Sequence, residues 1–123
     1  MKTPARAIGD NGEDCACKYL ISKSYKILDR NFFCKAGELD IISLSPDNET
    51  IVFVEVKTRS SLDYGYPYEF VNNKKQRRLI ITAEYYLKTK GIRDYQLRFD
   101  IIEILNLNNG TYVRHIENVF DFS

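Results

Sequence analysis

Two neighbouring stretches decide the fold: residues 37–42 read GELDII and residues 52–57 read VFVEVK. Both are apolar and rich in β-branched residues, as strands are. Residues 45–50, SPDNET, are turn-forming and separate them. The two stretches therefore predict an antiparallel hairpin. Each also carries charge where a core strand is normally apolar, and these charges are the first indication of function.

The expected hairpin brings the charges of the two strands together. If it is centred on residues 47–48, Asp40 lies opposite Glu55, and Glu38 lies opposite Lys57. Opposed Cβ atoms are about 5 Å apart, where two carboxylates repel each other unless a cation or a raised pKa compensates. One face is expected to combine this charged end with the apolar pairs Ile42–Phe53 and Leu44–Ile51. The other face is expected to be apolar, made of Leu39, Ile41, Val52, Val54 and Val56, so the hairpin should be buried on both sides.

Two interpretations of this charged end remain open. Asp40 and Glu55 either bind a divalent metal beside Lys57, or form with it a buried ion-pair network. Glu38 either joins the metal or pairs with Lys57. Glu13 shares the inward stripe of the first expected helix, where it is either a third metal ligand or an acid that interacts with the helix N-terminus.

The rest of the chain predicts two helices. The first is expected to start at a cap provided by Asp10 or Asn11 and to end at Ser24. The second is expected over residues 68–90, where Gly91 stops it. Their periodicity predicts two apolar faces, made of Ala16, Cys17, Leu20 and Ile21 in the first helix and of Leu79, Ile80, Ala83, Tyr86 and Leu87 in the second.

Three further strands complete the expected fold. They cover residues 25–34, 97–105 and 112–116, with a hairpin turn at residues 108–110 before the last. The order is α-β-β-β-α-β-β, which predicts an α/β (α+β) fold with a mixed central sheet flanked by helices.

Composition predicts one globular domain over residues 1–123, since 44% of the residues are hydrophobic and 28% charged. No apolar run approaches the ~20 residues of a membrane span, and no signal peptide is recognisable, so we expect no membrane partner and a cytoplasmic location. The three cysteines are an odd count, which favours reduced thiols, with Cys17 packed. A net charge of +1 argues against a generic nucleic-acid coat.

A local basic segment still allows nucleic-acid binding. Residues 74–78 read KKQRR, in which Lys74, Lys75, Arg77 and Arg78 either follow a phosphate backbone or form a solvated helix face. Arg59, expected in the loop after the second charged strand, is a further candidate for a phosphate contact.

Some other residues have less specific roles. The alternating Tyr64, Tyr66 and Tyr68 either stack on unpaired bases or pack within their loop. Asp100 and His115 are interpreted as structural.

The combination of Asp40 with Glu55-x-Lys57 on the next strand resembles the core of the PD-(D/E)xK nuclease superfamily. More of the chain resembles its YraN-like branch, a family of small bacterial proteins. The matching stretches are Gly9, Gly12-Glu13, Tyr19-Leu20, residues 27–32, 37–42 and 52–59, Gly65, Lys74 and residues 98–102. The resemblance therefore covers nearly the whole chain.

This resemblance implies a restriction-endonuclease-like fold, related to that of Holliday junction resolvases. It also implies that the chain cleaves nucleic acid, with DNA favoured over RNA as the substrate. It implies that Asp40 and Glu55 bind Mg²⁺ or Mn²⁺, that Glu13 completes the metal site, and that Lys57 activates the attacking water or stabilises the transition state. Resolvase relatives act as dimers, which implies a homodimer. Glu38 departs from the superfamily pattern, which has proline near this position.

Two other classes of function stay open. One is a non-catalytic nucleic-acid-binding module that keeps the nuclease fold. The other is an interaction subunit whose partner supplies the activity.

Overall fold

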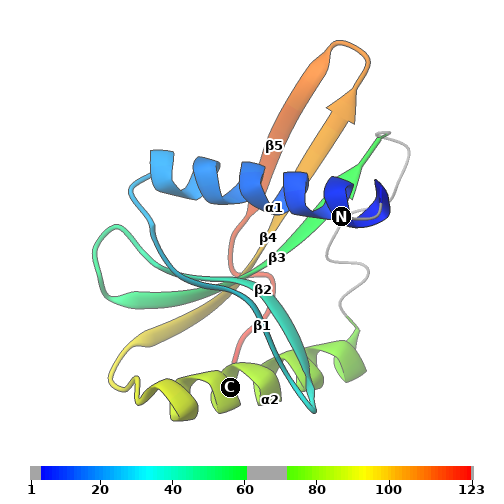
Figure 1. Cartoon of the computed structure of the whole chain (residues 1–123). Helices are drawn as coiled ribbons and strands as arrows, with labels where there is room; N and C mark the ends of the chain where they lie inside the picture. Colours follow the sequence, from blue (N-terminus) through cyan, green and yellow to red (C-terminus); the bar gives the residue numbers. More distant parts are fainter. Residues whose placement is uncertain (1–3, 61–71, 123) are drawn as a thin grey trace.

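The computed structural model describes residues 4–60 and 72–122, and only the backbone of residues 4–11. Within these residues, five strands form one sheet with a helix on each face (Figure 1), which confirms the expected order α-β-β-β-α-β-β and the mixed sheet. The elements are α1 (Pro4–Ser22), β1 (Lys26–Cys34), β2 (Gly37–Leu44), β3 (Thr50–Arg59), α2 (Asn73–Lys90), β4 (Gln96–Leu107) and β5 (Gly110–Ile116).

The strands lie in the sheet in the order in which they occur in the sequence. β3 and β4 are parallel, and α2 lies between them in the chain; the other neighbours are antiparallel. The expected register between β2 and β3 is confirmed over residues 41–44, where Ile41 pairs with Val54 and Leu44 with Ile51. The turn at residues 108–109 joins β4 to β5 as predicted.

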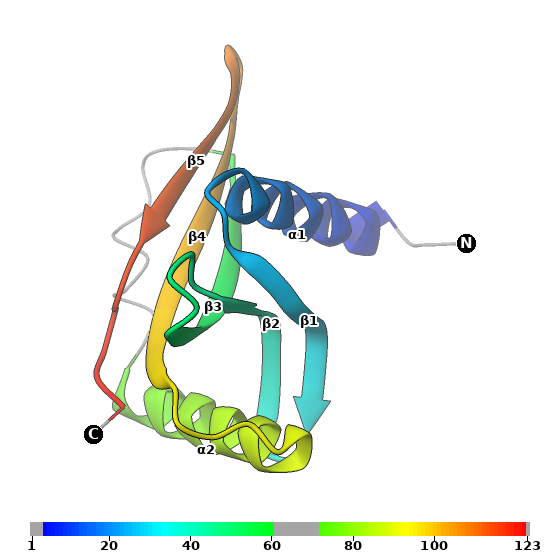
Figure 2. The ribbon, with the colours of Figure 1, turned by 90° about the vertical axis from the view of Figure 1, so that its left-hand side faces the viewer.

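The sheet separates two apolar cores (Figure 2). Under α2, the rings of Phe53, Tyr86 and Phe99 pack together, and Phe120 and Phe122 from the C-terminal segment add to them. Under α1, Ala16, Cys17 and Leu20 pack on the opposite face, as their stripe predicts. Burial on both faces explains why β2 and β3 read as nearly continuous apolar runs.

The first helix starts earlier than predicted. α1 begins at Pro4, and Asp10 and Asn11 lie within it rather than at its cap. Proline suits the first helical position because its φ is already helical and the N–H that it lacks would have no partner there. Ile21 was assigned to the buried stripe, but its side chain is 60% exposed. Cys17 is buried, as predicted, and none of the three cysteines forms a disulfide within the described residues.

The second helix starts at Asn73, with Asn72 as its N-cap, while residues 68–71 of the expected helix lie outside the described residues. The Asn72 side chain accepts a hydrogen bond of 2.9 Å from the backbone N–H of Lys75. At the other end Gly91 adopts φ 66°, which glycine reaches without steric cost, and stops the helix as predicted.

Neither helix, within the described residues, is long and apolar enough to span a bilayer.

Replacing Asn72 tests the cap that holds the first turn of α2. Asn72→Ala removes the acceptor for the Lys75 N–H, so we expect the free energy of unfolding to fall by about 1 kcal/mol. Asn72→Asp keeps an acceptor and should retain wild-type stability. Urea unfolding of the three proteins measures the difference; equal losses in both variants would contradict the assignment of this cap.

Candidate functional site

The candidate site begins where the β2–β3 ladder stops. The paired residues end at Ile41 and Val54, one step before Asp40 and Glu55. Beyond that step, Oδ2 of Asp40 accepts a hydrogen bond of 2.8 Å from the backbone N–H of Val56. The predicted ladder pairs of Asp40 with Glu55 and of Glu38 with Lys57 are therefore wrong, because a carboxylate takes the place of a main-chain acceptor.

The regular alternation of side chains is also interrupted at this point. Leu39 packs in the core under α2 together with Ile42, whereas strict alternation places it with Ile41 on the α1 side. In β1, Asn31 lies between residues paired with Leu39 and Ile41, and it has φ 54°. Asparagine tolerates this left-handed conformation better than most residues. The expected assignment of Leu39 to the other face is wrong because both strands bend here.

Glu55 lies between two lysines. Its Oε1 is 3.3 Å from Nζ of Lys57 and 2.7 Å from Nζ of Lys75. Its Oε2 is buried and, among the described residues, has no hydrogen-bond partner. A buried carboxylate oxygen without a donor is costly, so this atom is available to a further ligand.

A cavity of about 290 Å³ connects the two acids with the start of α2. Asp40 and Glu55 line it from the sheet, and Lys75 and Arg78 line it from the helix. Apolar and small residues complete its walls, among them Gly37, Leu39, Leu79, Thr82 and Phe99. The cavity therefore joins negative and positive groups over an apolar floor, which suits a charged ligand.

The carboxyl group of Asp40 is strongly perturbed. Burial, the largest effect, raises its pKa to about 6, although the hydrogen bond from Val56 lowers it. The negative charges nearby raise the pKa of Asp40 further; they belong to Glu55, Glu13 and Glu38. Perturbed carboxyl groups in a cavity are typical of functional sites.

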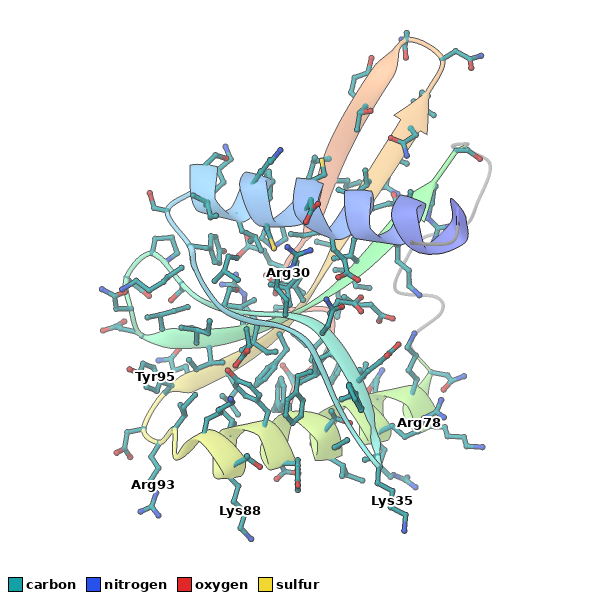
Figure 3. The ribbon with its side chains drawn as sticks, in the orientation of Figure 1. Arg30, Lys35, Arg78, Lys88, Arg93 and Tyr95 are labelled. Carbon is teal, nitrogen blue, oxygen red and sulfur yellow. The ribbon has the colours of Figure 1, made fainter. Side chains whose placement is uncertain are left out.

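The two further acids of the prediction lie at the edges of the site. Glu13, on α1, is 3.8 Å from Nη2 of Arg30, which also contacts Asp14 at 2.8 Å; Figure 3 shows Arg30 between α1 and the sheet. Glu38 is exposed and lines the cavity. Its expected ion pair with Lys57 is not formed among the described residues, where Lys57 pairs with Glu55 instead.

The predicted basic residues separate into three groups. Lys75 lies in the site, while Lys74, Arg77 and Arg78 are exposed on α2, and Figure 3 shows Arg78 pointing outward. Arg59 is the last residue of β3 rather than part of a loop, and it pairs with Glu103. Tyr64, Tyr66 and Tyr68 lie outside the described residues.

Sequence reasoning missed the buried Glu103. Its side chain is completely buried in β4 and pairs with Arg59 of β3 and Arg114 of β5. Such a buried charge is tolerated because both oxygens have cationic partners. The hairpin predicted from the turn at residues 108–110 places Arg114 opposite Glu103, whereas the contact with Arg59 depends on the parallel pairing of β3 with β4.

Asp100 and His115 form a separate network beneath α1. His115 Nε2 is 2.7 Å from Asp100 Oδ2, and Arg98 contacts the same carboxylate at 2.9 Å. Burial alone would raise the pKa of Asp100, but the hydrogen bonds from His115 and Arg98 hold it below its usual range. The described contacts of both residues are with neighbouring strands and α1, in keeping with a structural role.

The oxygen ligands of the site fit a small hard cation. In the described part of the chain, no three His, Cys, Asp or Glu side chains are grouped to hold a metal. Mg²⁺, however, is usually held by one or two carboxylates together with water and phosphate. Asp40 and Glu55 supply such a pair. Oε2 of Glu55, which accepts no hydrogen bond from the described residues, can serve as a metal ligand.

Comparison with known proteins identifies relatives of nearly the same length. The sequence pattern of a family described as "Uncharacterised protein family UPF0102" matches residues 12–104. The UPF0102 protein of Persephonella marina is 49% identical over 113 residues, covering 92% of each chain. That of Caldanaerobacter subterraneus subsp. tengcongensis is 45% identical, covering 97% of this chain and 98% of the relative.

Among solved structures, the fold is similar to that of SfsA from Pyrococcus furiosus, solved in complex with Ca²⁺. The TM-score is 0.40 and the identity 16%, and the match covers 92% of this chain and 63% of SfsA. The chain thus spans less than two thirds of that protein.

The raised pKa of Asp40 predicts how stability depends on pH. Because the folded protein binds this proton more tightly than the unfolded chain, ionisation of Asp40 costs stability above pH 6, and the cost disappears as the pH falls towards 4. Asp40→Asn keeps an acceptor for Val56 and cannot ionise. In EDTA we expect it to be more stable than wild type at pH 8 by about 2–3 kcal/mol, and little different at pH 4.

Urea unfolding across this pH range measures the difference. Glu84→Gln, which removes an exposed acid of α2, serves as the control and should follow the wild-type curve. An Asp40→Asn profile that is parallel to that of the wild type would disprove the burial and charge repulsion inferred for Asp40.

Proposed function

The chain belongs to the UPF0102 family, and we propose that it is a metal-dependent nuclease that hydrolyses phosphodiester bonds in DNA. The single observation that carries this proposal is the pair of half-buried acids at the end of the β2–β3 ladder, one with a raised pKa and one with a buried oxygen lacking a donor. The cationic side chains beside them suit a phosphate.

Each residue of the site has a distinct task in this proposal. Asp40 and Glu55 would hold Mg²⁺ or Mn²⁺, and Glu13 and Glu38 lie near enough for their charges to raise the pKa of Asp40. The bound metal supplies Lewis acidity and lowers the pKa of its water. Lys57, two residues after Glu55 and 3.3 Å from its Oε1, orients the attacking water or stabilises the charge of the transition state.

The protein also supplies means of positioning the substrate. Arg78 lines the cavity, and Lys74 and Arg77 are exposed on the same end of α2. Their guanidinium and ammonium groups suit the phosphates on either side of the cleaved bond, and binding through them weakens as salt is added. Because Arg59 is paired with Glu103, we assign it a structural role at the end of β3 and not a contact with phosphate.

The second candidate function is nucleic-acid binding without catalysis. The observation that favours it is the double ion pair of Glu55, whose charge is already balanced by Lys57 and Lys75. Such a module binds DNA equally well in EDTA and in Mg²⁺. A nuclease binds metal through Asp40 and Glu55 and cuts DNA only when metal is present.

Cleavage of branched, flapped and nicked DNA in Mg²⁺ or Mn²⁺ tests the proposed function. We expect Asp40→Ala and Glu55→Ala to abolish detectable cleavage, and Lys57→Met to reduce the rate about 100-fold while metal still binds. Glu84→Ala, an exposed acid on α2, should leave the rate unchanged. Cleavage that survives both acid substitutions would show that the reaction occurs elsewhere.

A further inference from the structure

Lys75 differs from the other cations of α2 because it faces the sheet. It precedes the buried Leu79 by four residues and the buried Thr82 by seven, and so continues their inward stripe by one turn. Lys74, its neighbour, is exposed. The side chain of Lys75 is 27% exposed, and its Nζ lies 2.7 Å from Oε1 of Glu55.

The first turn of α2 determines where Lys75 lies. The Asn72 side chain accepts from the backbone N–H of Lys75, which stabilises the first turn of α2 in which Lys75 lies. Lys75 then lines the same cavity as Asp40 and Glu55, and its contact with Oε1 is shorter than the 3.3 Å of Lys57. The only described cation that α2 places on Glu55 is this lysine.

A cation on Glu55 changes the charge that a metal encounters. With Lys75 in place, Glu55 carries two ion pairs, and a divalent cation entering between Asp40 and Glu55 meets an ammonium group at the same carboxylate. Like charges this close repel each other in a partly buried site. Metal and Lys75 are therefore competitors for Glu55.

On the basis of the proposed function, we propose that Lys75 is an internal counter-ion which occupies Glu55 in the metal-free protein and transfers to a phosphate of the substrate when metal binds. The same lysine then opposes metal binding in the absence of DNA and favours it in the presence of DNA. Metal and DNA consequently bind with positive coupling, each raising the affinity for the other by the same factor.

Titration with Mn²⁺ in the absence of DNA tests the competition. By calorimetry, Lys75→Met should bind Mn²⁺ at least about fivefold more tightly than wild type. Lys88→Met, which removes the same charge from the exposed last turn of α2, should keep the wild-type affinity. Lys75→Arg retains the cation and should restore weak binding, which a merely structural role of the side chain would not explain.

The second measurement tests the transfer to phosphate. The affinity for a hydrolysis-resistant phosphorothioate DNA duplex is measured by fluorescence anisotropy in EDTA and in Mn²⁺. We expect Mn²⁺ to raise the DNA affinity of wild type and of Lys88→Met at least about fivefold, and to have much less effect on Lys75→Met.

The outcomes distinguish failure of this inference from failure of the proposed function. If Mn²⁺ binds through Asp40 and Glu55, but Lys75→Met and Lys88→Met behave alike, Lys75 is not a counter-ion and the nuclease proposal stands. If neither the wild type nor Lys75→Met binds Mn²⁺, or if Asp40→Asn and Glu55→Gln bind it unchanged, both proposals are overturned. If Lys75→Met binds Mn²⁺ and the wild type shows no detectable binding, the result supports the proposed competition.

Discussion

The hydrogen bond from the Val56 N–H to the Asp40 carboxylate is the interaction on which the site depends. It replaces the next rung of the β2–β3 ladder, so the two strands separate while both remain anchored in the sheet. The carboxyl group is thereby held in a buried place among other acids, where its pKa is raised to about 6. In a regular antiparallel ladder, a main-chain carbonyl of β2 would accept from the Val56 N–H in place of this carboxylate.

The surrounding charges show how the fold tolerates several acids in one place. Glu55 is balanced by lysines from its own strand and from α2, and Glu103 by arginines from both neighbouring strands. Asp40 alone among these three acids has no cationic partner among the described residues, and its pKa is raised. The charge that remains uncompensated therefore lies next to the free oxygen of Glu55.

Much of the fold could be predicted from local patterns, and the site only in part. The turn at residues 45–50 and the apolar runs on either side determined the register of β2 and β3. The break at Asp40 could not be predicted, since it depends on a side chain replacing a main-chain acceptor. Lys75 was recognisable in principle, because the stripe through Leu79 extends to it. The contact of Arg59 with Glu103 could not be predicted, because it requires the parallel pairing of β3 with β4.

The order of the strands has a consequence for how the site forms during folding. β2 and β3 are joined by a short turn, so the two acids come together through contacts that are local in the sequence. Lys75 lies on α2, in the connection between the parallel strands β3 and β4. Forming this long connection has a higher entropic cost of loop closure than forming the short β2–β3 turn. The hairpin thus brings the two carboxylates together with Lys57 by local contacts, whereas the second cation on Glu55 depends on a contact that is distant in the sequence.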